Sequence, residues 1–344
     1  MIVVFVMAGV LWGTGMAMGA PKRARWTMIA FLVGAVLLAQ LILPDGHPLR
    51  NATGGDVRLW ALLLGFFAVF TGYRGLLRRL RVKAEPVVVQ PAAGATFSAT
   101  ELDRYARHIM LREIGGPGQK SLRAARVLVV GAGGLGSSAL QYLAAAGVGT
   151  IGVIDDDVVD NSNLQRQVIH TDDRIGDPKV TSAADAMTAL NPFVTVRPYH
   201  RRLTAQDAAG IITDYDLVLD GTDNFDTRYL VNATCVALGK PLIAAAMTQW
   251  EGQISLYDPA KNAPCFACVF PVAPDAGLVP SCAEAGIVGP LPGVMGAMMA
   301  LEAVKEITQA GEGLRGRLLI YDALYAQTRV ISVKRDAQCA VCGR

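Results

Sequence analysis

The amino-terminal part of the chain is a series of apolar runs separated by short basic segments. Residues 26–44 contain no charged side chain and approach the ~20 apolar residues that a helix needs to cross a bilayer. Residues 59–73 form a shorter uncharged run, and residues 1–20 are apolar but contain four glycines. This pattern predicts a membrane region over residues 1–81 with two or three transmembrane helices.

The basic residues around these runs predict how the region is oriented. The second run is preceded by Lys22, Arg23 and Arg25, the third is followed by Arg74, Arg78, Arg79, Arg81 and Lys83, and the loop between them holds Arg50 and Arg58. Because Lys and Arg gather on the cytoplasmic side, we expect a multi-pass protein of the cell inner membrane, in contact with membrane lipid, with a cytoplasmic catalytic domain. A cleaved secretory signal over residues 1–20 is the alternative, but no basic residue precedes its apolar run.

After residue 81 the pattern changes. Residues 82–98 hold two prolines and several small residues, which is typical of a linker. Ser98 and Glu101 then have the spacing of a capping box, which predicts a helix start. Farther on, short apolar strands alternate with helical segments, and these strands cover residues 126–130, 150–154, 195–199, 217–220 and 241–246. The alternation predicts an α/β domain over residues 99–344, built as a Rossmann-like, doubly wound and mostly parallel sheet.

Composition supports the membrane prediction and argues against one class of partner. Only 18% of the 344 residues are charged, and the mean hydropathy is +0.35. Such a hydropathy is high for a soluble protein, which agrees with a part of the chain lying in lipid. The net charge of +3 is too small to indicate nucleic-acid binding, so no nucleic-acid partner is expected.

A glycine-rich loop follows the first predicted strand and precedes a helix. Its glycines are Gly131, Gly133, Gly134 and Gly136. Glycine lets the backbone approach phosphates, and a helix N-terminus attracts their charge. Asp155 ends the next strand, 19 residues after Gly136, where an acid can bind a ribose diol. The loop predicts nucleotide binding without separating NAD from ATP, and a tight turn without a ligand is the alternative.

The residues after Asp155 favour ATP. Asn163, Arg166 and Lys179 follow it within a short stretch. A hydride-transfer site has little need for such charge, whereas Arg166 and Lys179 can neutralise charge that develops on the α-phosphate and pyrophosphate of an attacked triphosphate. An NAD-dependent oxidoreductase is therefore disfavoured, although each cation taken alone is also compatible with a solvated surface charge.

A second acidic position follows a later strand. Residues 217–220 run into the sequence DGTDN, which contains Asp223 and Asn224. An acid at the carboxyl end of a strand faces the ligand crevice of a doubly wound sheet, so Asp223 is a candidate Mg²⁺ ligand. The alternative is an N-cap of the helix that begins near Asn224, and the two roles are compatible.

Four of the six cysteines form two Cys-x-x-Cys pairs. These pairs are Cys265 with Cys268 and Cys339 with Cys342, and their spacing fits a tetrahedral Zn²⁺ site without an open position for catalysis. A disulfide would need an oxidising compartment, which the predicted topology disfavours. Cys235 lies in an apolar helical stretch and is interpreted as a small buried hydrophobic residue.

The motifs GAGGLGSS, DDDVVDNSNLQRQ, GDPK, LVLDGTDN, CFAC and CAVC occur in this order. With them, residues 99–344 resemble the molybdopterin-synthase and thiamine-biosynthesis adenylyltransferases, which are relatives of ubiquitin-activating enzymes. The resemblance implies that the glycine loop and Asp155 hold ATP and that Asn163, Arg166 and Lys179 contact its phosphates. It further implies that Asp223 serves the Mg²⁺-dependent chemistry, while Ser162 and Asn224 belong to the same nucleotide-binding motifs.

The resemblance also implies partners and a reaction. Arg107 matches an arginine that reaches into the partner subunit's site, which implies a homodimer, and the paired cysteines match a structural zinc site. The implied reaction is ATP-dependent adenylation of the C-terminal Gly-Gly carboxylate of a ubiquitin-like sulfur-carrier protein. We expect a separate sulfur donor, because no rhodanese-type extension follows Cys342. Cys282 lies where some family members form a thioester or persulfide and others work without it.

Two other functions remain open from the sequence. A tRNA threonylcarbamoyl-adenosine dehydratase also adenylates a carboxylate, but the paired cysteines argue against it. A non-catalytic membrane docking protein for a ubiquitin-like partner would not need Asp155, Arg166, Lys179 and Asp223 together.

Overall fold

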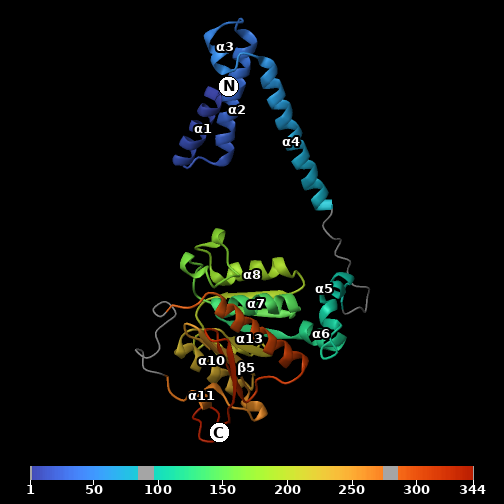
Figure 1. Cartoon of the computed structure of the whole chain (residues 1–344), viewed down its shortest axis with the longest axis vertical. Helices are drawn as coiled ribbons and strands as arrows, with labels where there is room; N and C mark the ends of the chain where they lie inside the picture. Colours follow the sequence, from blue (N-terminus) through green and yellow to red (C-terminus); the bar gives the residue numbers. More distant parts are fainter. Residues whose placement is uncertain (1, 84–96, 274–285, 344) are drawn as a thin grey trace. The chain divides into compact units, whose positions relative to one another are not determined.

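The computed structural model describes residues 2–83, 97–273 and 286–343. It divides into two compact units, Met1–Val88 and Val89–Arg344 (Figure 1). Most of the predicted linker, residues 84–96, lies outside the described residues. Each unit has its own buried apolar cluster.

The described residues of the first unit are mainly helical. Its helices are α1 (Ile2–Ala17), α2 (Lys22–Ile42), α3 (Pro48–Thr53) and α4 (Val57–Lys83). The predicted spans thus coincide with α1, α2 and α4. Within the described residues one helix, Arg23–Ile42, is long and apolar enough to cross a membrane, and Val3–Ala17 is a shorter apolar helix. Because this criterion uses length and composition alone, the transmembrane region stays a prediction.

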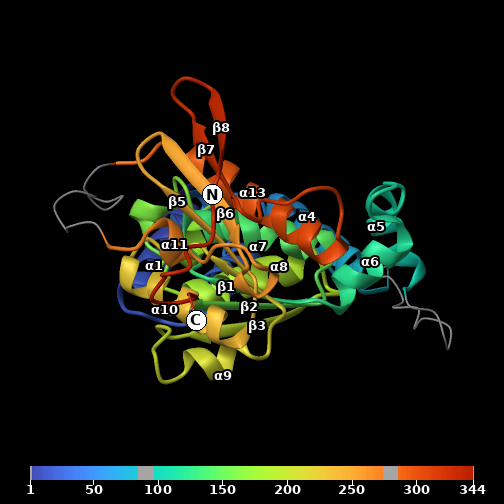
Figure 2. The ribbon, with the colours of Figure 1, turned by 90° about the horizontal axis from the view of Figure 1, so that it is seen from below.

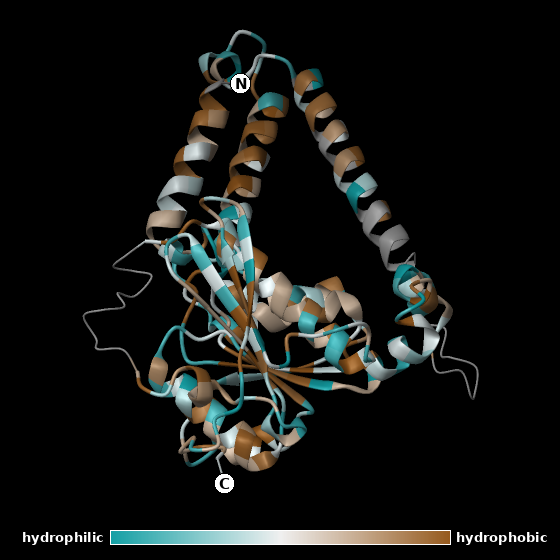
Figure 3. Cartoon of the chain, turned by 60° about the horizontal axis from the view of Figure 1, so that its bottom comes forward, coloured by the Kyte–Doolittle hydropathy of each residue, from teal (hydrophilic) through white to brown (hydrophobic). Residues whose placement is uncertain are grey.

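The core of the first unit is small. Val4, Val36 and Trp60 form its buried cluster. Around them large hydrophobic side chains face outward on α1, α2 and α4, and Phe31 and Phe66 are each 75% exposed. Figure 3 shows hydrophobic residues along much of these three helices. Apolar surface of this extent is unfavourable in water and marks a surface that contacts lipid or protein.

The second unit is built on one eight-stranded sheet with the order β3-β2-β1-β4-β5-β6-β7-β8. The strands are β1 (Arg126–Val130), β2 (Thr150–Asp155), β3 (Thr195–His200), β4 (Leu217–Asp220), β5 (Leu242–Met247), β6 (Glu251–Tyr257), β7 (Arg317–Asp322) and β8 (Gln327–Ser332). Neighbours among β1–β5 pair in parallel, whereas β6, β7 and β8 extend the sheet in antiparallel fashion. The predicted mostly parallel α/β sheet is confirmed.

Helices cover both faces of this sheet (Figure 2). They are α5 (Ala99–Ile109), α6 (Gly115–Ala124), α7 (Gly134–Ala146), α8 (Lys179–Leu190), α9 (Ala208–Ile212), α10 (Phe225–Leu238), α11 (Phe266–Val269) and α13 (Pro290–Thr308). One apolar core joins the sheet to α7, α8 and α13, and the other joins it to α9, α10 and α11. The four residues of β4 are all buried, as expected for a parallel strand covered on both faces.

The beginning of the second unit is tied to the sheet by α5. Its start is the predicted capping box, in which the Ser98 hydroxyl accepts a hydrogen bond from the Glu101 amide and the Glu101 carboxylate accepts one from the Ser98 amide. Tyr105 packs against Gly147 at the end of α7, where a Cβ atom would lie 2.5 Å from the ring. The Tyr105 hydroxyl accepts a hydrogen bond from Asn191.

The strand order locates the ligand crevice. The chain moves outward from β1 through β2 to β3 and then returns to β4 on the other side of β1. In open α/β sheets the crevice lies at the carboxyl ends of the strands where the order reverses, here between β1 and β4. The two loops approach closely at this point, since a Cβ on Gly131 would lie 3.2 Å from the carbonyl oxygen of Gly221.

Candidate active site

The glycine loop leaves β1 and enters α7 in a tight turn that excludes side chains. Gly131 has φ of 97°, a conformation that favours glycine. A Cβ on Gly136 would lie 2.0 Å from the carbonyl oxygen of Gly131, and one on Gly134 would lie 2.8 Å from the Pro292 side chain. Gly133 caps α7, whose free backbone N–H groups point toward the crevice end of the helix. The loop therefore has the form of a phosphate-binding turn.

Asp155 lies at the end of β2, beside this loop. One of its carboxylate oxygens accepts a hydrogen bond of 2.7 Å from the Ala132 amide, and the other accepts one of 2.8 Å from the Asp157 amide. The carboxylate is half-buried and is thus held at the crevice by two backbone donors. Each oxygen keeps a lone pair for a further donor, such as a ribose hydroxyl.

Arg166 also lies beside the glycine loop. Its guanidinium donates to the Asn163 side-chain oxygen at 2.7 Å and to the Ser162 carbonyl at 3.3 Å. A Cβ on Gly134 would lie 3.7 Å from the Arg166 side chain, so the arginine flanks the first turn of α7. The Ser162 hydroxyl is engaged by Asp160. The predicted trio of Ser162, Asn163 and Arg166 is therefore one hydrogen-bonded group, with the arginine next to the glycine loop.

Lys179 is the first residue of α8 and is buried, with 4% of its surface exposed. Its ammonium group pairs with the Asp157 carboxylate at 2.7 Å, and its amide donates to the Asp157 carbonyl at 3.0 Å. The Asp157 side chain is exposed, so the pair opens toward solvent at the carboxyl end of β2. A buried ammonium with a single carboxylate partner retains donors for a phosphate oxygen.

Asp223 and Asn224 are neighbours in the chain but have different places in the structure. Asn224 is the N-cap of α10, because its side chain accepts a hydrogen bond of 2.9 Å from the Thr227 amide. Asp223 precedes the cap and is exposed. Its loop is held from behind, since the buried Arg228 donates to the carbonyls of Thr222 and Ala245. The Asp223 carboxylate is thus presented at the carboxyl edge of β4, as a hard oxygen ligand for Mg²⁺ requires.

Two further residues at this edge were not singled out as site residues from the sequence, although Gln167 ends the motif DDDVVDNSNLQRQ. Gln167 is buried, its side-chain carbonyl oxygen has no hydrogen-bond partner, and its amide nitrogen would lie 3.8 Å from a Cβ on Gly133. His170 is also buried and hydrogen-bonds the Ala132 carbonyl. The residue type alone does not indicate a functional site, because buried glutamine and histidine also occur in ordinary packing. Only the fold brings them beside the loop.

A pocket of about 400 Å³ opens between the β5–β6 turn and the start of α13, lined by Gln249, Trp250, Gly286, Ile287 and Val288. It lies near the Arg166 segment, because a Cβ on Gly289 would lie 2.7 Å from the Gln165 carbonyl. The Trp250 side chain is 44% exposed and gives the pocket an apolar wall.

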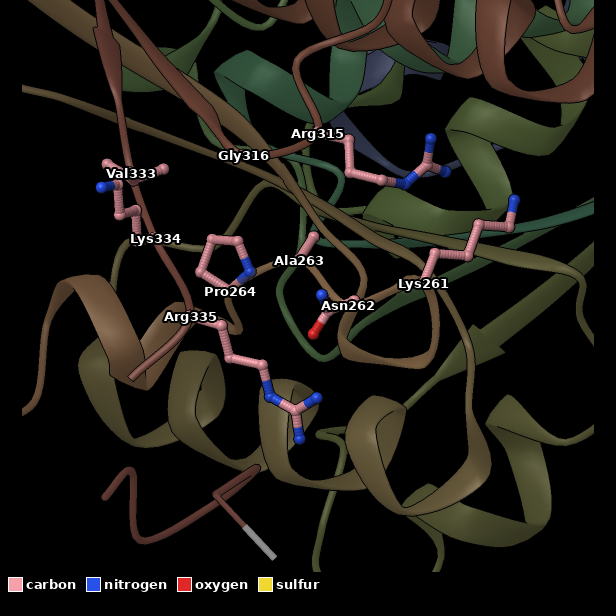
Figure 4. Close-up of a pocket in the computed structure, with 9 residues that line it drawn as sticks. All are labelled: Lys261, Asn262, Ala263, Pro264, Arg315, Gly316, Val333, Lys334 and Arg335. Atoms are coloured by element: carbon pink, nitrogen blue, oxygen red, sulfur yellow. The ribbon is translucent and has the colours of Figure 1, made fainter. Parts of the chain in front are cut away.

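A larger pocket of about 510 Å³ is lined by Lys261, Asn262, Ala263, Pro264, Arg315, Gly316, Val333, Lys334 and Arg335 (Figure 4). It follows the end of β6, which pairs with the start of β5, so it lies at the edge of the sheet opposite to the glycine loop. Arg315 is paired with Asp258 and Glu306. In Figure 4 the Arg335 guanidinium lies apart from the Arg315 guanidinium and the Lys261 ammonium group, so the cations do not converge on one ligand.

Arg107 and Cys282 were also predicted as site residues. Arg107 is in the last turn of α5 and is exposed. Its predicted place in a partner subunit's site stays a prediction. Cys282 lies outside the described residues.

The four paired cysteines come together as predicted. Their sulfur atoms lie within 4.8 Å of one another, with separations of 3.6 Å for Cys265 and Cys339, 3.3 Å for Cys268 and Cys342, and 3.8 Å for Cys265 and Cys268. In a tetrahedral site with Zn–S bonds of about 2.3 Å, neighbouring sulfurs are about 3.8 Å apart. The cluster therefore fits a structural Zn²⁺ ion, whose binding would join the carboxyl-terminal segment to α11.

Two further groups donate hydrogen bonds to these sulfurs. The Asn232 amide side chain, on α10, donates to Cys265 at 3.7 Å and also accepts a bond from the Phe266 amide. The Asp336 amide donates to Cys268 at 3.4 Å. Such donors orient metal ligands and stabilise thiolate charge.

Comparisons with known proteins agree with this geometry. Residues 105–341 match the model of the ThiF family. The chain is 50% identical over 251 residues to the sulfur carrier protein adenylyltransferase of Thermus thermophilus, a match that covers 72% of this chain and 93% of that protein. It is 48% identical over 248 residues to the SAMP-activating enzyme E1 of Haloferax volcanii, which covers 72% of this chain and 91% of that protein.

Solved structures show the same fold. The crystal structure of E. coli MccB with AMPCPP and MccA superposes with a TM-score of 0.63 at 25% identity, over 72% of this chain and 76% of that one. The two curated relatives match this chain at far higher identity than MccB does. The family resemblance noted from the motifs is confirmed. The chain therefore belongs to the ThiF family.

Proposed function

We propose that this protein is an adenylyltransferase that uses ATP to activate the C-terminal Gly-Gly carboxylate of a ubiquitin-like sulfur-carrier protein. The observation that carries the proposal is the gathering of the glycine loop, Asp155, Arg166, Lys179 and Asp223 at one edge of the sheet. The relatives that share 48–50% of their residues with the chain are named as a sulfur carrier protein adenylyltransferase and a SAMP-activating enzyme.

The chemistry follows from the charges at that edge. A carboxylate oxygen of the carrier attacks the α-phosphorus of ATP, the bond from that phosphorus to the bridging oxygen breaks, and pyrophosphate leaves with the electron pair. The products are the acyl-adenylate and pyrophosphate. Arg166 and Lys179 flank the loop from two sides and stabilise the negative charge that builds on the phosphates in the transition state. The protein supplies position and charge, and this step needs no nucleophile of its own.

Each bound group has a place among the described residues. The glycine loop and Asp155 hold the nucleotide, and Asp223 is the residue that we propose would hold Mg²⁺, an ion that would supply positive charge to the triphosphate. The carrier's tail enters through the pocket beside Trp250, which adjoins the Arg166 segment. A Zn²⁺ ion at the four cysteines has no open coordination position and serves stability.

We further propose that the first unit holds the enzyme at the inner membrane, with the catalytic unit in the cytoplasm. The outward-facing apolar side chains of α1, α2 and α4 support this proposal, because they lack a protein core to cover them. The basic residues after residue 73 support the cytoplasmic side. A homodimer in which Arg107 serves the neighbouring site belongs to the same proposal and rests on the resemblance and on the exposure of Arg107.

The test is exchange of labelled pyrophosphate into ATP by the full-length protein in detergent, with Mg²⁺ and with each Gly-Gly-ending carrier in turn. We expect exchange that depends on one carrier. Asp223→Asn should lower it by about a hundredfold, the usual size of a lost electrostatic contact to a transition state. The matched control is Asp226→Asn, an exposed acid in the first turn of α10, which should leave the rate unchanged.

Two results would contradict the proposal. Equal rates for Asp223→Asn and the wild type would remove Asp223 from the site. Absence of exchange with every carrier would favour the tRNA dehydratase or the docking protein, and a threonylcarbamoyl-tRNA substrate would then distinguish these two.

A further inference from the structure

His170 is buried next to the nucleotide site, yet the proposed reaction assigns it no role. It is 5% exposed and lies four residues after Arg166. Both ring nitrogens are engaged: Nε2 lies 3.0 Å from the Ala132 carbonyl oxygen, and Nδ1 lies 3.0 Å from the Ser182 hydroxyl. The histidine therefore bridges the glycine loop and α8, the helix that begins with Lys179.

The chemistry of its partners fixes the tautomer. A carbonyl oxygen can only accept, so Nε2 must carry a proton and donate to Ala132. In the neutral ring Nδ1 is then an acceptor, and the Ser182 hydroxyl donates to it. Burial lowers the pKa of His170, and the nearby Lys179 ammonium acts in the same direction, whereas the hydrogen bond to Ala132 and the Asp155 carboxylate oppose the shift. The neutral form is thus the form that fits.

The bridge closes a ring of hydrogen bonds, which we name the loop ring. Its members are Ala132, Asp155, Asp157, Lys179, Ser182 and His170. From Ala132 the ring passes to the two oxygens of Asp155, to Asp157, to the Lys179 ammonium, along the first turn of α8 to Ser182, and through His170 back to Ala132. Every junction measures between 2.7 and 3.0 Å. The glycine loop, the end of β2 and the start of α8 are held together by this ring.

We propose that His170 is a positioning residue that presets the glycine loop for the triphosphate. The Ala132 carbonyl has two directions available, toward the ligand crevice or into the protein. A carbonyl oxygen that faced the crevice would repel phosphate oxygens, because both carry negative charge. His170 holds it on the buried side and at the same time fixes α8, so that the loop amides and Lys179 keep a constant separation. Such preorganisation acts on nucleotide affinity more than on the chemical step.

This inference rests on the proposed function only in assuming a triphosphate ligand, so its test begins with binding. Affinity of the full-length protein for a non-hydrolysable ATP analogue is measured by calorimetry, with folding checked by the melting temperature. His170→Phe keeps the ring shape but loses both hydrogen bonds, and it should weaken binding by about tenfold, as expected for one buried hydrogen bond. His170→Gln can still donate to Ala132 and should stay within about threefold of the wild type.

A double-mutant cycle separates positioning from packing. Ser182→Ala should weaken binding by about threefold in the wild-type background and should have no further effect in the His170→Gln background, because glutamine makes no bond from the Nδ1 position. Kinetics under saturating ATP should show the KM for ATP raised in His170→Phe and kcat within about twofold of the wild type. The matched control is His200→Gln, which changes an exposed histidine at the end of β3 whose ring also approaches a backbone carbonyl.

The result that would overturn the proposal is a folded His170→Phe protein with wild-type affinity for the analogue, or a His170→Gln protein as weak as His170→Phe. If His170→Phe fails to fold, the Ser182→Ala comparison decides alone, and an equal loss of affinity on Ser182→Ala in the wild-type and His170→Gln backgrounds counts against the loop ring. Failure of the proposed function reads differently, since the wild type would then bind the analogue but show no carrier-dependent exchange.

Discussion

Gly133 and Gly136 lie three residues apart in the same loop and differ in the space available for a side chain. Gly136 faces the backbone that it has just left, where a Cβ would lie 2.0 Å from the Gly131 carbonyl oxygen. Gly133 has ordinary room, since its nearest neighbour, the Gln167 side chain, would be 3.8 Å away. Gly136 is required by the turn itself, whereas Gly133 leaves space for a ligand.

This difference predicts that alanine at Gly136 lowers stability, whereas alanine at Gly133 lowers the affinity for ATP. Gly136→Ala should destabilise the catalytic unit by about 1–3 kcal/mol, because the backbone must move to admit the methyl group. Gly133→Ala should change stability by less than about 0.5 kcal/mol, yet weaken ATP binding, because the methyl group occupies the approach of phosphate to the backbone. Melting temperatures and calorimetric titrations with ATP check both statements. A fully stable Gly136→Ala protein would show that the loop has more freedom than its geometry indicates.

At the scale of elements, α10 connects two parts of the catalytic unit. Asn224 caps it next to Asp223, and two turns later Asn232 donates to Cys265 in the cysteine cluster. Arg228 lies between them and secures the loop before Asp223. One helix therefore contacts both the cysteine cluster and the loop that holds Asp223, a connection that the spacing of the cysteines does not reveal.

Removing one cysteine of the cluster should therefore cost stability. Cys265→Ala should abolish Zn²⁺ binding and lower the melting temperature of the catalytic unit by about 10 °C, since loss of a structural metal costs several kcal/mol and each kcal/mol lowers melting by about 2–4 °C in a domain of this size. Cys235→Ala is the matched control, because Cys235 is a buried cysteine of α10 outside the cluster. It should keep full metal content and lose about 1 kcal/mol. Zinc content by mass spectrometry and melting curves give the answer, and an unchanged Cys265→Ala protein would refute the structural metal.

The loop ring also makes stability depend on pH. His170 has a pKa below 6.5 in the folded protein because burial disfavours its charged form, and in the unfolded chain it titrates near that value. As pH falls below about 6.5, His170 takes up a proton in the unfolded state before it does so in the folded state. The contribution of neutral His170 to the free energy of unfolding is therefore complete at higher pH and is lost as pH falls toward the pKa of the folded protein. The charged groups facing it are Lys179 and Asp155, with Asp157 paired to Lys179.

We expect the melting temperature of the wild type to fall more steeply between pH 7 and pH 5 than that of His170→Gln, which has no group titrating at this position. Thermal unfolding of both proteins in the same detergent and buffer series measures the difference. Parallel curves for the two proteins would mean that His170 does not remain neutral in the folded state.

At the scale of the whole molecule, the two units differ in where their apolar side chains lie. The catalytic unit buries its apolar residues on both faces of a sheet, whereas the first unit exposes them along three helices. The basic residues at the two ends of its apolar runs favour one orientation, with the loop between α2 and α4 outside the cytoplasm. Asp45 lies in that loop with 93% of its side chain exposed.

This orientation predicts a labelling pattern in intact cells. Asp45→Cys should react with a membrane-impermeant maleimide from outside, whereas the wild type, whose cysteines all lie in the catalytic unit, should react only after lysis. Alkaline washing should leave both proteins in the membrane fraction. Asp45→Cys labelling that appears only after lysis would reverse the orientation, and release by the alkaline wash would argue against an integral membrane region.

The sequence by itself determined the features that depend on neighbours along the chain. The five parallel strands, the capping box at Ser98, the glycine loop and the two cysteine pairs are all visible there, because hydrophobic periodicity, turn chemistry and ligand spacing are local properties. Even the adjacency of Ser162, Asn163 and Arg166 follows from one short helical turn. The antiparallel strands β6, β7 and β8 were not predicted from the sequence, because polar residues interrupt their apolar runs, EGQISLY, RLLIYD and QTRVIS, whereas β1 and β4 are nearly continuous apolar runs.

Only the tertiary structure decided which distant residues meet. His170 and Gln167 come to the glycine loop, Asn232 to Cys265, and Asn224 rather than Asp223 caps α10, because the strand order brings the ends of β1, β2 and β4 to one edge of the sheet. Contacts between residues tens of positions apart depend on burial, register and the satisfaction of polar groups, and none of these is written in the local pattern of the chain.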